Sequence, residues 1–262
     1  MTRAVAGNRV TVKQILQPNA DPHEYEPRPS DAEAIANAKL VIRSGGDVDD
    51  WLGGVIAQAG GKARVVTLID HVQRRGHDPH WWQDPRNGEL AVQAIRDALI
   101  SRDPNGAAGY RARAAAYLTR LRALDKGIAA CVAHLPPGQR RLVTSHDALG
   151  YYANRYGFKV IGAAIPSLST QAQPSAKATQ RLVAQIKQQH VAAIFPESSL
   201  NPKLEQAIGR DAGAKVGGAL WADSLGPKGS SGATYAGSLA ANTRTIVSAL
   251  SRGKVNCGGL PG

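Results

Sequence analysis

The sequence is poor in cysteine and in aromatic residues, and it has no long apolar run. Its two cysteines, Cys131 and Cys257, form no Cys-x-x-Cys pair, which excludes a cysteine-based zinc finger. They can pair as one disulfide in an exported protein, and two free thiols are equally consistent with the sequence. No stretch approaches the roughly 18 consecutive apolar residues that a membrane-spanning helix needs. Residues 1–12 contain no apolar signal-peptide core, so the chain as given carries no export signal.

Motifs of several enzyme classes and of nucleic-acid binding are also missing. No His-Glu-x-x-His pair, Gly-x-Ser-x-Gly turn or Gly-x-x-x-x-Gly-Lys-Ser/Thr loop occurs, which argues against the corresponding proteases, hydrolases and nucleotide-binding enzymes. The net charge of +12 would suit a polyanionic partner. The basic residues are scattered, however, and form no stripe interleaved with aromatic residues, which make up only 5% of the chain. We therefore expect no nucleic-acid binding.

The sequence does contain a regular alternation of strand-like and helix-like segments. With 262 residues, 43% of them hydrophobic, the chain can form two lobes of roughly 100 to 130 residues. Short runs rich in Val and Ile predict strands at 9–16, 40–44, 63–69, 141–145, 159–165, 191–196 and 215–220. Segments with capping residues predict helices at 29–39, 48–59, 87–101, 147–157, 174–190 and 201–213. Such alternation predicts an α/β fold with mainly parallel sheets.

One segment, 107–134, differs from the others because it is a long Ala-, Leu- and Arg-rich run without proline. It predicts a single helix of roughly 40 Å, given a rise of 1.5 Å per residue. We expect this helix to be a rigid linker between an N-terminal α/β lobe, 1–106, and a C-terminal α/β lobe, 135–262.

The tripeptide Asp-Pro-His occurs twice, ending in His23 and in His80, each time in a polar loop that contains proline. Proline favours an extended conformation for the preceding residue, so each motif presents an imidazole at a loop tip. His146 and Asp223 are two further candidate ligands. Three imidazoles and one carboxylate complete the four-coordinate shell that zinc usually has.

The predicted strands place these four residues on one side of the molecule. His23 follows the first predicted strand, His80 the third, His146 ends the fourth, and Asp223 lies beyond the last. Ligands of open α/β sheets bind outside the carboxyl ends of the strands. The four residues, two from each lobe, are therefore expected to form a metal site in the cleft between the lobes.

The chain resembles the zinc- and manganese-specific solute-binding proteins of ABC transporters, the group called cluster A-I. The resemblance covers nearly the whole length and rests on five segments in the same order, namely DPHEYEPRPSD, DPHWWQDPRN, VTSHDALGYYANRYG, IFPESSLNPK and WADSLGP. It implies two α/β lobes joined by a rigid backbone helix, and an interlobe site for Zn²⁺, or alternatively Mn²⁺. The ligands carried over are His23, His80, His146 and Asp223.

The resemblance also implies a partner and a location. The expected partner is the membrane permease of an ABC transporter, and the expected location is the periplasm or the extracellular face of the cell membrane. We expect a monomer without enzymatic activity. Relatives begin with a further strand and helix, so the first strand, most of the first helix and any leader are expected to be missing here.

Residues beside the candidate ligands have more than one interpretation. Glu197 follows a predicted strand at the same edge, as a possible alternative ligand or as a partner of a ligand. Acidic neighbours could orient a ligand histidine through its ring N–H, or they could be simple loop carboxylates. These neighbours are Glu24, Glu26, Asp84 and Asp147. Alternative functions are a metal-dependent adhesin, a metal buffer and a zinc hydrolase, which would need an open coordination position for water.

Overall fold

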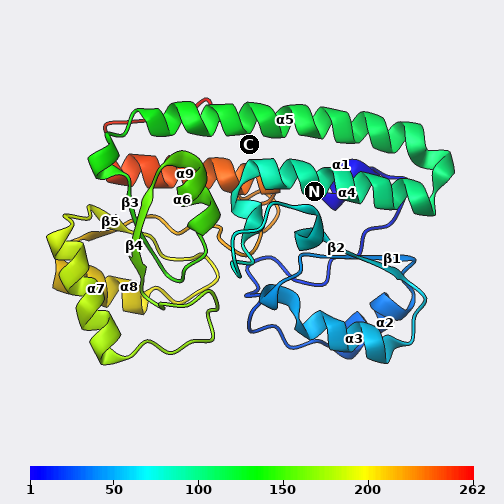
Figure 1. The fold of residues 1–262 in the computed structure, drawn as a ribbon, viewed down its shortest axis with the longest axis horizontal. Coiled ribbons are helices and arrows are strands. Elements are labelled where there is room, and N and C mark those ends of the chain that lie inside the picture. Colours follow the sequence, from blue (N-terminus) through cyan, green and yellow to red (C-terminus); the bar gives the residue numbers. More distant parts are fainter.

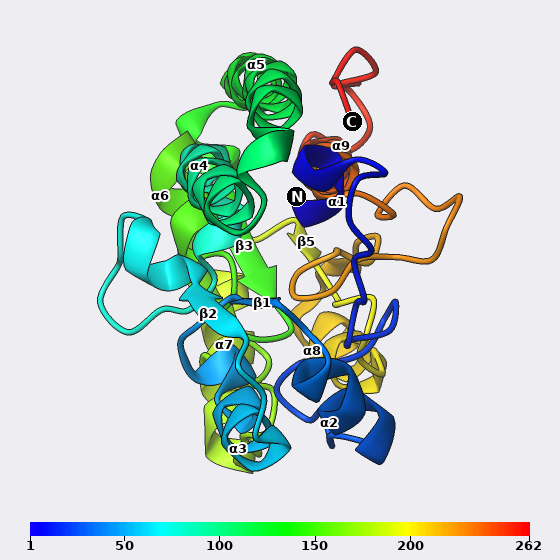
Figure 2. The same ribbon diagram turned by 90° about the vertical axis from the view of Figure 1, so that its right-hand side faces the viewer.

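Long helices form a layer that spans the molecule, and two groups of short strands lie on one side of it (Figure 1). The computed structural model describes residues 1–262. The layer contains α4 (Pro85–Arg102), α5 (Ala107–Ala133) and α9 (Tyr235–Leu250). Figure 2, turned by 90°, shows these three helices gathered together, with α2 and α3 on the far side of the strands. The predicted helix at 107–134 is confirmed as α5. It does not stand alone between the two groups of strands, because α4 and α9 pack against it.

The N-terminal group of strands is a small parallel sheet with helices packed around it. It is made by α2 (Pro29–Ala36), β1 (Leu40–Arg43), α3 (Trp51–Ala59) and β2 (Arg64–Thr67). β1 pairs with β2 in parallel, with Leu40 opposite Arg64 and Arg43 opposite Thr67. The short helix α1 (Thr2–Ala6) packs against α4 and α5.

The C-terminal group also contains only parallel pairs. Its elements are β3 (Arg141–Thr144), α6 (Gly150–Tyr156), β4 (Lys159–Ala163), α7 (Ala176–Gln188), β5 (Ala193–Ile194), α8 (Lys203–Ala212) and β6 (Lys215–Val216). β3 pairs with β4, and β5 pairs with β6. A parallel bridge between Thr144 and Phe195 joins the two pairs. The prediction of an α/β fold with parallel sheets is confirmed.

The predicted strand at 9–16 is wrong. Residues 9, 10 and 16 lie in bends and residues 11–15 have no regular secondary structure; no strand lies beside this segment, and none of its backbone groups pairs with another backbone group. Val10 and Val12 are half-buried against the main hydrophobic core. The Val and Ile content that predicted a strand therefore reflects packing of a single irregular segment against the core rather than sheet formation.

Helix α9 has no counterpart among the helices predicted from the sequence. Twelve of its sixteen residues are buried, so it lacks the polar face that makes a surface helix recognisable. The local signal that was present is Thr234, whose side-chain oxygen accepts from the N–H of Gly237 and caps the helix.

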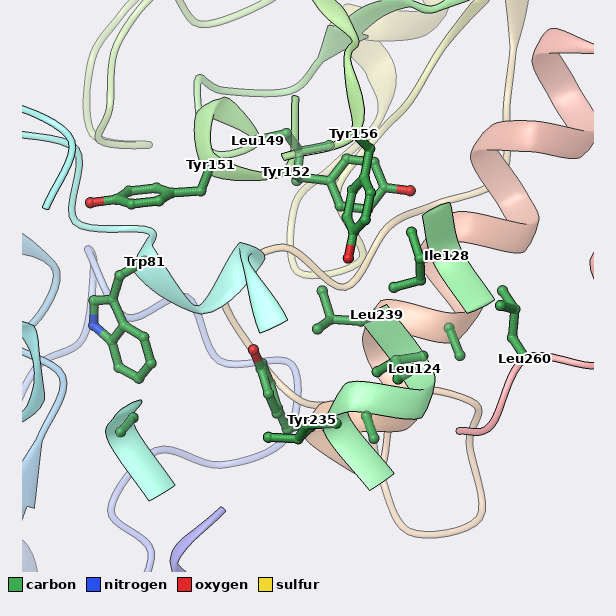
Figure 3. Close-up of a cluster of buried hydrophobic side chains, with 14 of the residues drawn as sticks. Trp81, Leu124, Ile128, Leu149, Tyr151, Tyr152, Tyr156, Tyr235, Leu239 and Leu260 are labelled. Atoms are coloured by element: carbon green, nitrogen blue, oxygen red, sulfur yellow. The ribbon is translucent and has the colours of Figure 1, made fainter. Parts of the chain in front are cut away.

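The main core joins the helical layer to both groups of strands. Figure 3 shows Tyr152 and Tyr156 of α6 beside Ile128 of α5, with Leu239 and Tyr235 of α9 close by. A disulfide links Cys131 of α5 to Cys257 in the C-terminal segment, with 5.7 Å between the Cα atoms. Of the two alternatives for the cysteines, the structure shows the paired one. None of the helices combines the length and apolar character needed to cross a membrane.

Candidate metal centre

The two Asp-Pro-His motifs form the same local turn. The backbone N–H of His23 donates to Asp21 Oδ1 at 2.9 Å, and that of His80 donates to Asp78 Oδ1 at 3.0 Å. An aspartate that bonds the backbone two residues ahead is an Asx turn, which holds the following residue in a defined orientation. The repeated tripeptide therefore presents two imidazoles in the same way.

The structure brings together all four side chains that the sequence analysis selected. One ligand atom each from His23, His80, His146 and Asp223 lies within 4.8 Å of every other. His146 lies two residues beyond the end of β3, whereas Asp223 lies in the loop that precedes α9. The side chains of the three histidines are at most 2% exposed, and that of Asp223 is fully buried. These groups thus form a closed cluster.

All three histidines direct Nε2 towards the carboxylate of Asp223. The Nε2 atoms of His146 and His23 lie 3.0 and 3.3 Å from Asp223 Oδ2, and Nε2 of His80 lies 3.5 Å from Oδ1. The Nε2 atoms of His80 and His146 are 3.3 Å apart. Ligands at about 2.0–2.1 Å from a tetrahedral zinc ion would be separated by about 3.3 Å. These four separations, 3.0 to 3.5 Å, fit that geometry.

Buried polar atoms without hydrogen-bond partners support the same interpretation. His23 Nε2 and both carboxylate oxygens of Asp223 are buried and make no hydrogen bond of acceptable geometry. An unsatisfied buried polar group costs free energy, so such groups gather where a ligand or an ion supplies the missing interaction.

Two further carboxylates orient the histidine rings. Asp78 Oδ1 forms a hydrogen bond with Nδ1 of His80 at 2.8 Å, whereas Glu197 Oε2 forms an ion-pair contact with Nδ1 of His146 at 2.9 Å, without the angles of a hydrogen bond. An N–H on Nδ1 that is held by a carboxylate leaves the lone pair of Nε2 free to bind a metal and raises the basicity of the ring. Glu197 could be selected from the sequence as a partner of a ligand, whereas the same role of Asp78 was not predicted, although the Asp of the repeated motif was the available signal.

The other acidic neighbours make no hydrogen bond to a histidine ring. Glu24 and Glu26 are exposed, and Asp84 caps α4 by accepting from the N–H of Arg86 at 2.9 Å. Asp147 is half-buried and forms no side-chain hydrogen bond. For these four residues the simpler interpretation as loop carboxylates is the one that fits.

The charges of the cluster perturb one another. Burial lowers the pKa of His146, but the carboxylates of Asp223 and Glu197 outweigh burial and hold this pKa well above its ordinary value. Burial raises the pKa of Asp223, but His146 and His80 lower this pKa by more than burial raises it, so the net shift is downward. Burial and the charge of Asp223 raise the pKa of Glu197. An ionised Asp223 therefore faces a ring that readily accepts a proton or a cation.

Hydrogen bonds between the lobes hold the histidine loops against the Asp223 loop. Trp82 Nε1 and Gln83 Nε2 both donate to the carbonyl of Ala222, at 2.8 and 2.7 Å. The hydroxyl of Tyr235 donates to the carbonyl of Trp82 at 2.7 Å. The loop of His80 and the loop of Asp223 are therefore fixed relative to each other, although they are far apart in the sequence.

A family model described as zinc-uptake complex component A, periplasmic, matches residues 1–249. The chain belongs to this family, ZnuA. The resemblance noted in the sequence is thereby confirmed. ZnuA-family proteins are the metal-binding solute-binding components of ABC transporters.

Similar proteins in this family are named for different metals. The manganese-binding lipoprotein MntA of Halalkalibacterium halodurans is 33% identical over 253 residues, which are 95% of this chain and 84% of that protein. The structure of the periplasmic zinc-binding protein TroA of Treponema pallidum matches with a TM-score of 0.88 and 31% identity, covering 95% of this chain and 94% of that chain. The iron-binding protein YfeA of Yersinia pestis is 29% identical and covers 86% of this chain and 75% of that protein. The family match thus establishes metal binding in transport without selecting the metal.

Proposed function

We propose that this protein binds one zinc ion through His23, His80, His146 and Asp223 and delivers it to the membrane permease of an ABC transporter. The observation that carries the proposal is the convergence of four buried donor groups: each of the three Nε2 atoms lies 3.0 to 3.5 Å from an oxygen of Asp223, and one ligand atom from each residue lies within 4.8 Å of the others. Zinc is here the transported cargo. Because similar proteins are named as periplasmic proteins or lipoproteins, we propose that delivery takes place in the cell envelope.

The donor set supports zinc over manganese. Three nitrogens and one carboxylate suit zinc, whereas oxygen-rich sites suit manganese. Asp78 and Glu197 are both engaged by Nδ1 atoms, so they orient nitrogen ligands in this proposal and do not add oxygen ligands.

Four protein ligands also favour transport over hydrolysis. A catalytic zinc needs an open position for water, and four donors fill the usual tetrahedral shell. We therefore propose that the protein has no enzymatic activity. His23 and His80 come from the N-terminal part of the chain, whereas His146 and Asp223 come from the C-terminal part. Separation of the two lobes would divide the shell in half and lower its affinity for the ion.

The experiment is a competition titration of metal-free protein with zinc and manganese. We expect one zinc ion per chain and a preference for zinc over manganese. Replacement of His23, His80 or His146 by Ala should each weaken zinc binding by orders of magnitude. The exposed His71 and His77 provide matched controls, and their replacement by Ala should leave the affinity unchanged.

Two results would contradict the proposal. Zinc binding that survives all three histidine substitutions would place the ion elsewhere. Failure of zinc to raise the melting temperature of metal-free protein at neutral pH would show that the folded state does not bind it.

A further inference from the structure

The C-terminal lobe has a pronounced charge imbalance. Residues 135–262 contain 14 lysines and arginines but only 5 acidic residues, so they carry nine of the twelve net positive charges of the chain. Glu197, Glu205 and Asp223 are buried, which leaves Asp147 half-buried and Asp211 exposed. The exposed charged groups of this lobe are therefore almost all cationic.

A cleft of about 500 Å³ opens at the end of this lobe that is away from the metal centre. Arg141, at its wall, begins β3, whereas His146 follows the opposite end of the same strand. α5 and α9 both end on this side of the molecule, at the left of Figure 1. The ionisable side chains that line the cleft are all basic, namely His134, Arg141, His190, Arg252 and Lys254.

Two of these lining residues have an unusual backbone conformation. His190 has φ 51° and Arg252 has φ 55°, and the only other non-glycine residue with positive φ is Asn19. Asparagine and histidine occur in the left-handed region more often than other non-glycine residues, whereas arginine is strained there. Backbone strain that persists at a surface cleft is an indication of function.

Both residues occupy the position that ends a helix. The N–H groups of His190 and Val191 bond back to the carbonyls of Lys187 and Ile186, which is a Schellman motif at the end of α7. In the same way, Arg252 and Gly253 close the end of α9.

Glycine is the preferred residue at this position of the motif. The chain follows that preference elsewhere, because α3, α6 and α8 end with Gly60, Gly157 and Gly213 in the left-handed conformation. Only α7 and α9, which both end at the cationic cleft, have a basic residue in the left-handed conformation at this position.

Stabilisation of helix ends accounts for part of this arrangement. The C-terminus of a helix carries a partial negative charge of about one half, and α5, α7 and α9 all end here. Three such ends offset about half of the charge of Arg141, Arg252 and Lys254. The cleft therefore stays cationic. The partial charge at the end of a helix can also be offset by a basic residue that is not in the left-handed position. For α9, Lys254, two residues beyond Arg252, could have this role.

We propose that this cleft binds a phosphate group, and that His190 and Arg252 occupy left-handed positions because their side chains contact it. The volume suits a phosphate-bearing small molecule or the head group of an anionic lipid. Arginine recognises phosphate through paired N–H donors. This inference is independent of the proposed zinc function.

The test uses two probes on metal-free full-length protein, because one probe itself chelates zinc. Inorganic pyrophosphate is titrated calorimetrically, and vesicles of phosphatidylglycerol in phosphatidylcholine are used in sedimentation. We expect saturable binding of at least one probe. Binding of pyrophosphate alone identifies a soluble ligand, and binding of the vesicles alone identifies a lipid head group; both results support the proposal.

Substitution by glycine separates ligand binding from folding. Arg252→Gly and His190→Gly remove the side chain and relieve the strain, so the melting temperature should stay unchanged or rise. Binding of the probe should weaken about tenfold or more for Arg252→Gly, the loss expected for a charged hydrogen bond. Zinc affinity should not change in either variant.

Two controls make the outcome decisive. Asn19→Gly places glycine at the third left-handed non-glycine position without removing a charge, and Lys177→Ala removes one exposed charge at the opposite end of α7. Both should leave probe binding within threefold of the unsubstituted protein. Absence of saturable binding to both probes would overturn the proposal, since the basic residues would then only stabilise the helix ends. An equal loss of probe affinity in Lys177→Ala and Arg252→Gly would also overturn it, since the probe would then respond only to the overall positive charge of the lobe.

Discussion

Replacement of Glu197 by Gln tests how the metal centre depends on a residue that orients a ligand. Oε2 of Glu197 lies 2.9 Å from Nδ1 of His146, and its Oε1 accepts from the hydroxyl of Ser199 at 2.7 Å. Glu197 as a whole is only 4% exposed. An amide has a single acceptor oxygen, so glutamine cannot serve both donors in the present geometry. The substitution keeps the size of the side chain and removes its charge.

The expected effect is a loss of zinc affinity of about 10- to 100-fold, the usual cost of removing a partner of a metal-binding histidine. That range corresponds to about 1.4–2.8 kcal/mol of binding free energy. The effect should depend on pH. Glu197 and Asp223 hold the pKa of His146 well above its ordinary value, against the effect of burial. The variant lowers this pKa, so protons compete less with zinc, and the loss should be larger at about pH 8 than at about pH 5.5.

The assay is competition for zinc against a fluorescent chelator at both pH values. Asp125→Asn is a matched control, because Asp125 is also a buried acid but accepts from Arg155 and Tyr156, away from the cluster. A change of less than threefold at the higher pH would refute the reasoning. A loss as large as that of His146→Ala would instead make Glu197 a direct ligand.

Three further predictions concern metal choice, pH and the disulfide. His146→Glu should reduce the ratio of zinc affinity to manganese affinity, mainly by weakening zinc binding, because it exchanges a nitrogen ligand for an oxygen ligand. An unchanged ratio in competition titration would show that His146 does not bind the metal. Zinc affinity of the unsubstituted protein should fall by about tenfold per pH unit once the pH drops below the raised pKa of His146, where zinc must displace a proton; a pH-independent dissociation constant would contradict this. Loss of the disulfide in Cys131→Ala/Cys257→Ala should lower the free energy of unfolding by about 4–5 kcal/mol, as closure of a long loop predicts. Urea unfolding measures this value, and an unchanged midpoint would show that the disulfide does not constrain the unfolded chain.

The candidate ligands could be predicted from the sequence because their signals are local. Each Asp-Pro-His turn is formed by residues within three positions, and the aspartate bonds the backbone of its own histidine. The helix at 107–134 was equally recognisable, since an uninterrupted run without proline has few alternatives to a helix. The lobe boundaries placed on either side of that helix stay a prediction.

Only the tertiary structure decided the features that depend on distant partners. Residues 9–16 have the pattern of a strand, but a strand forms only where another segment offers backbone groups to pair with. Burial on nearly all sides concealed α9, because the helical period is visible only when one face meets water.

The same reason applies to the metal centre and to the cysteines. The sequence could select four donor residues by their chemistry, but the spacing of their Nε2 and carboxylate atoms follows from the packing of two lobes. The engagement of His146 by Glu197 and the pairing of Cys131 with Cys257 join residues far apart in the chain. Local sequence determines which groups are available and how each turn presents them, whereas long-range packing determines which of them meet, because contact energies act between neighbours in space and not along the chain.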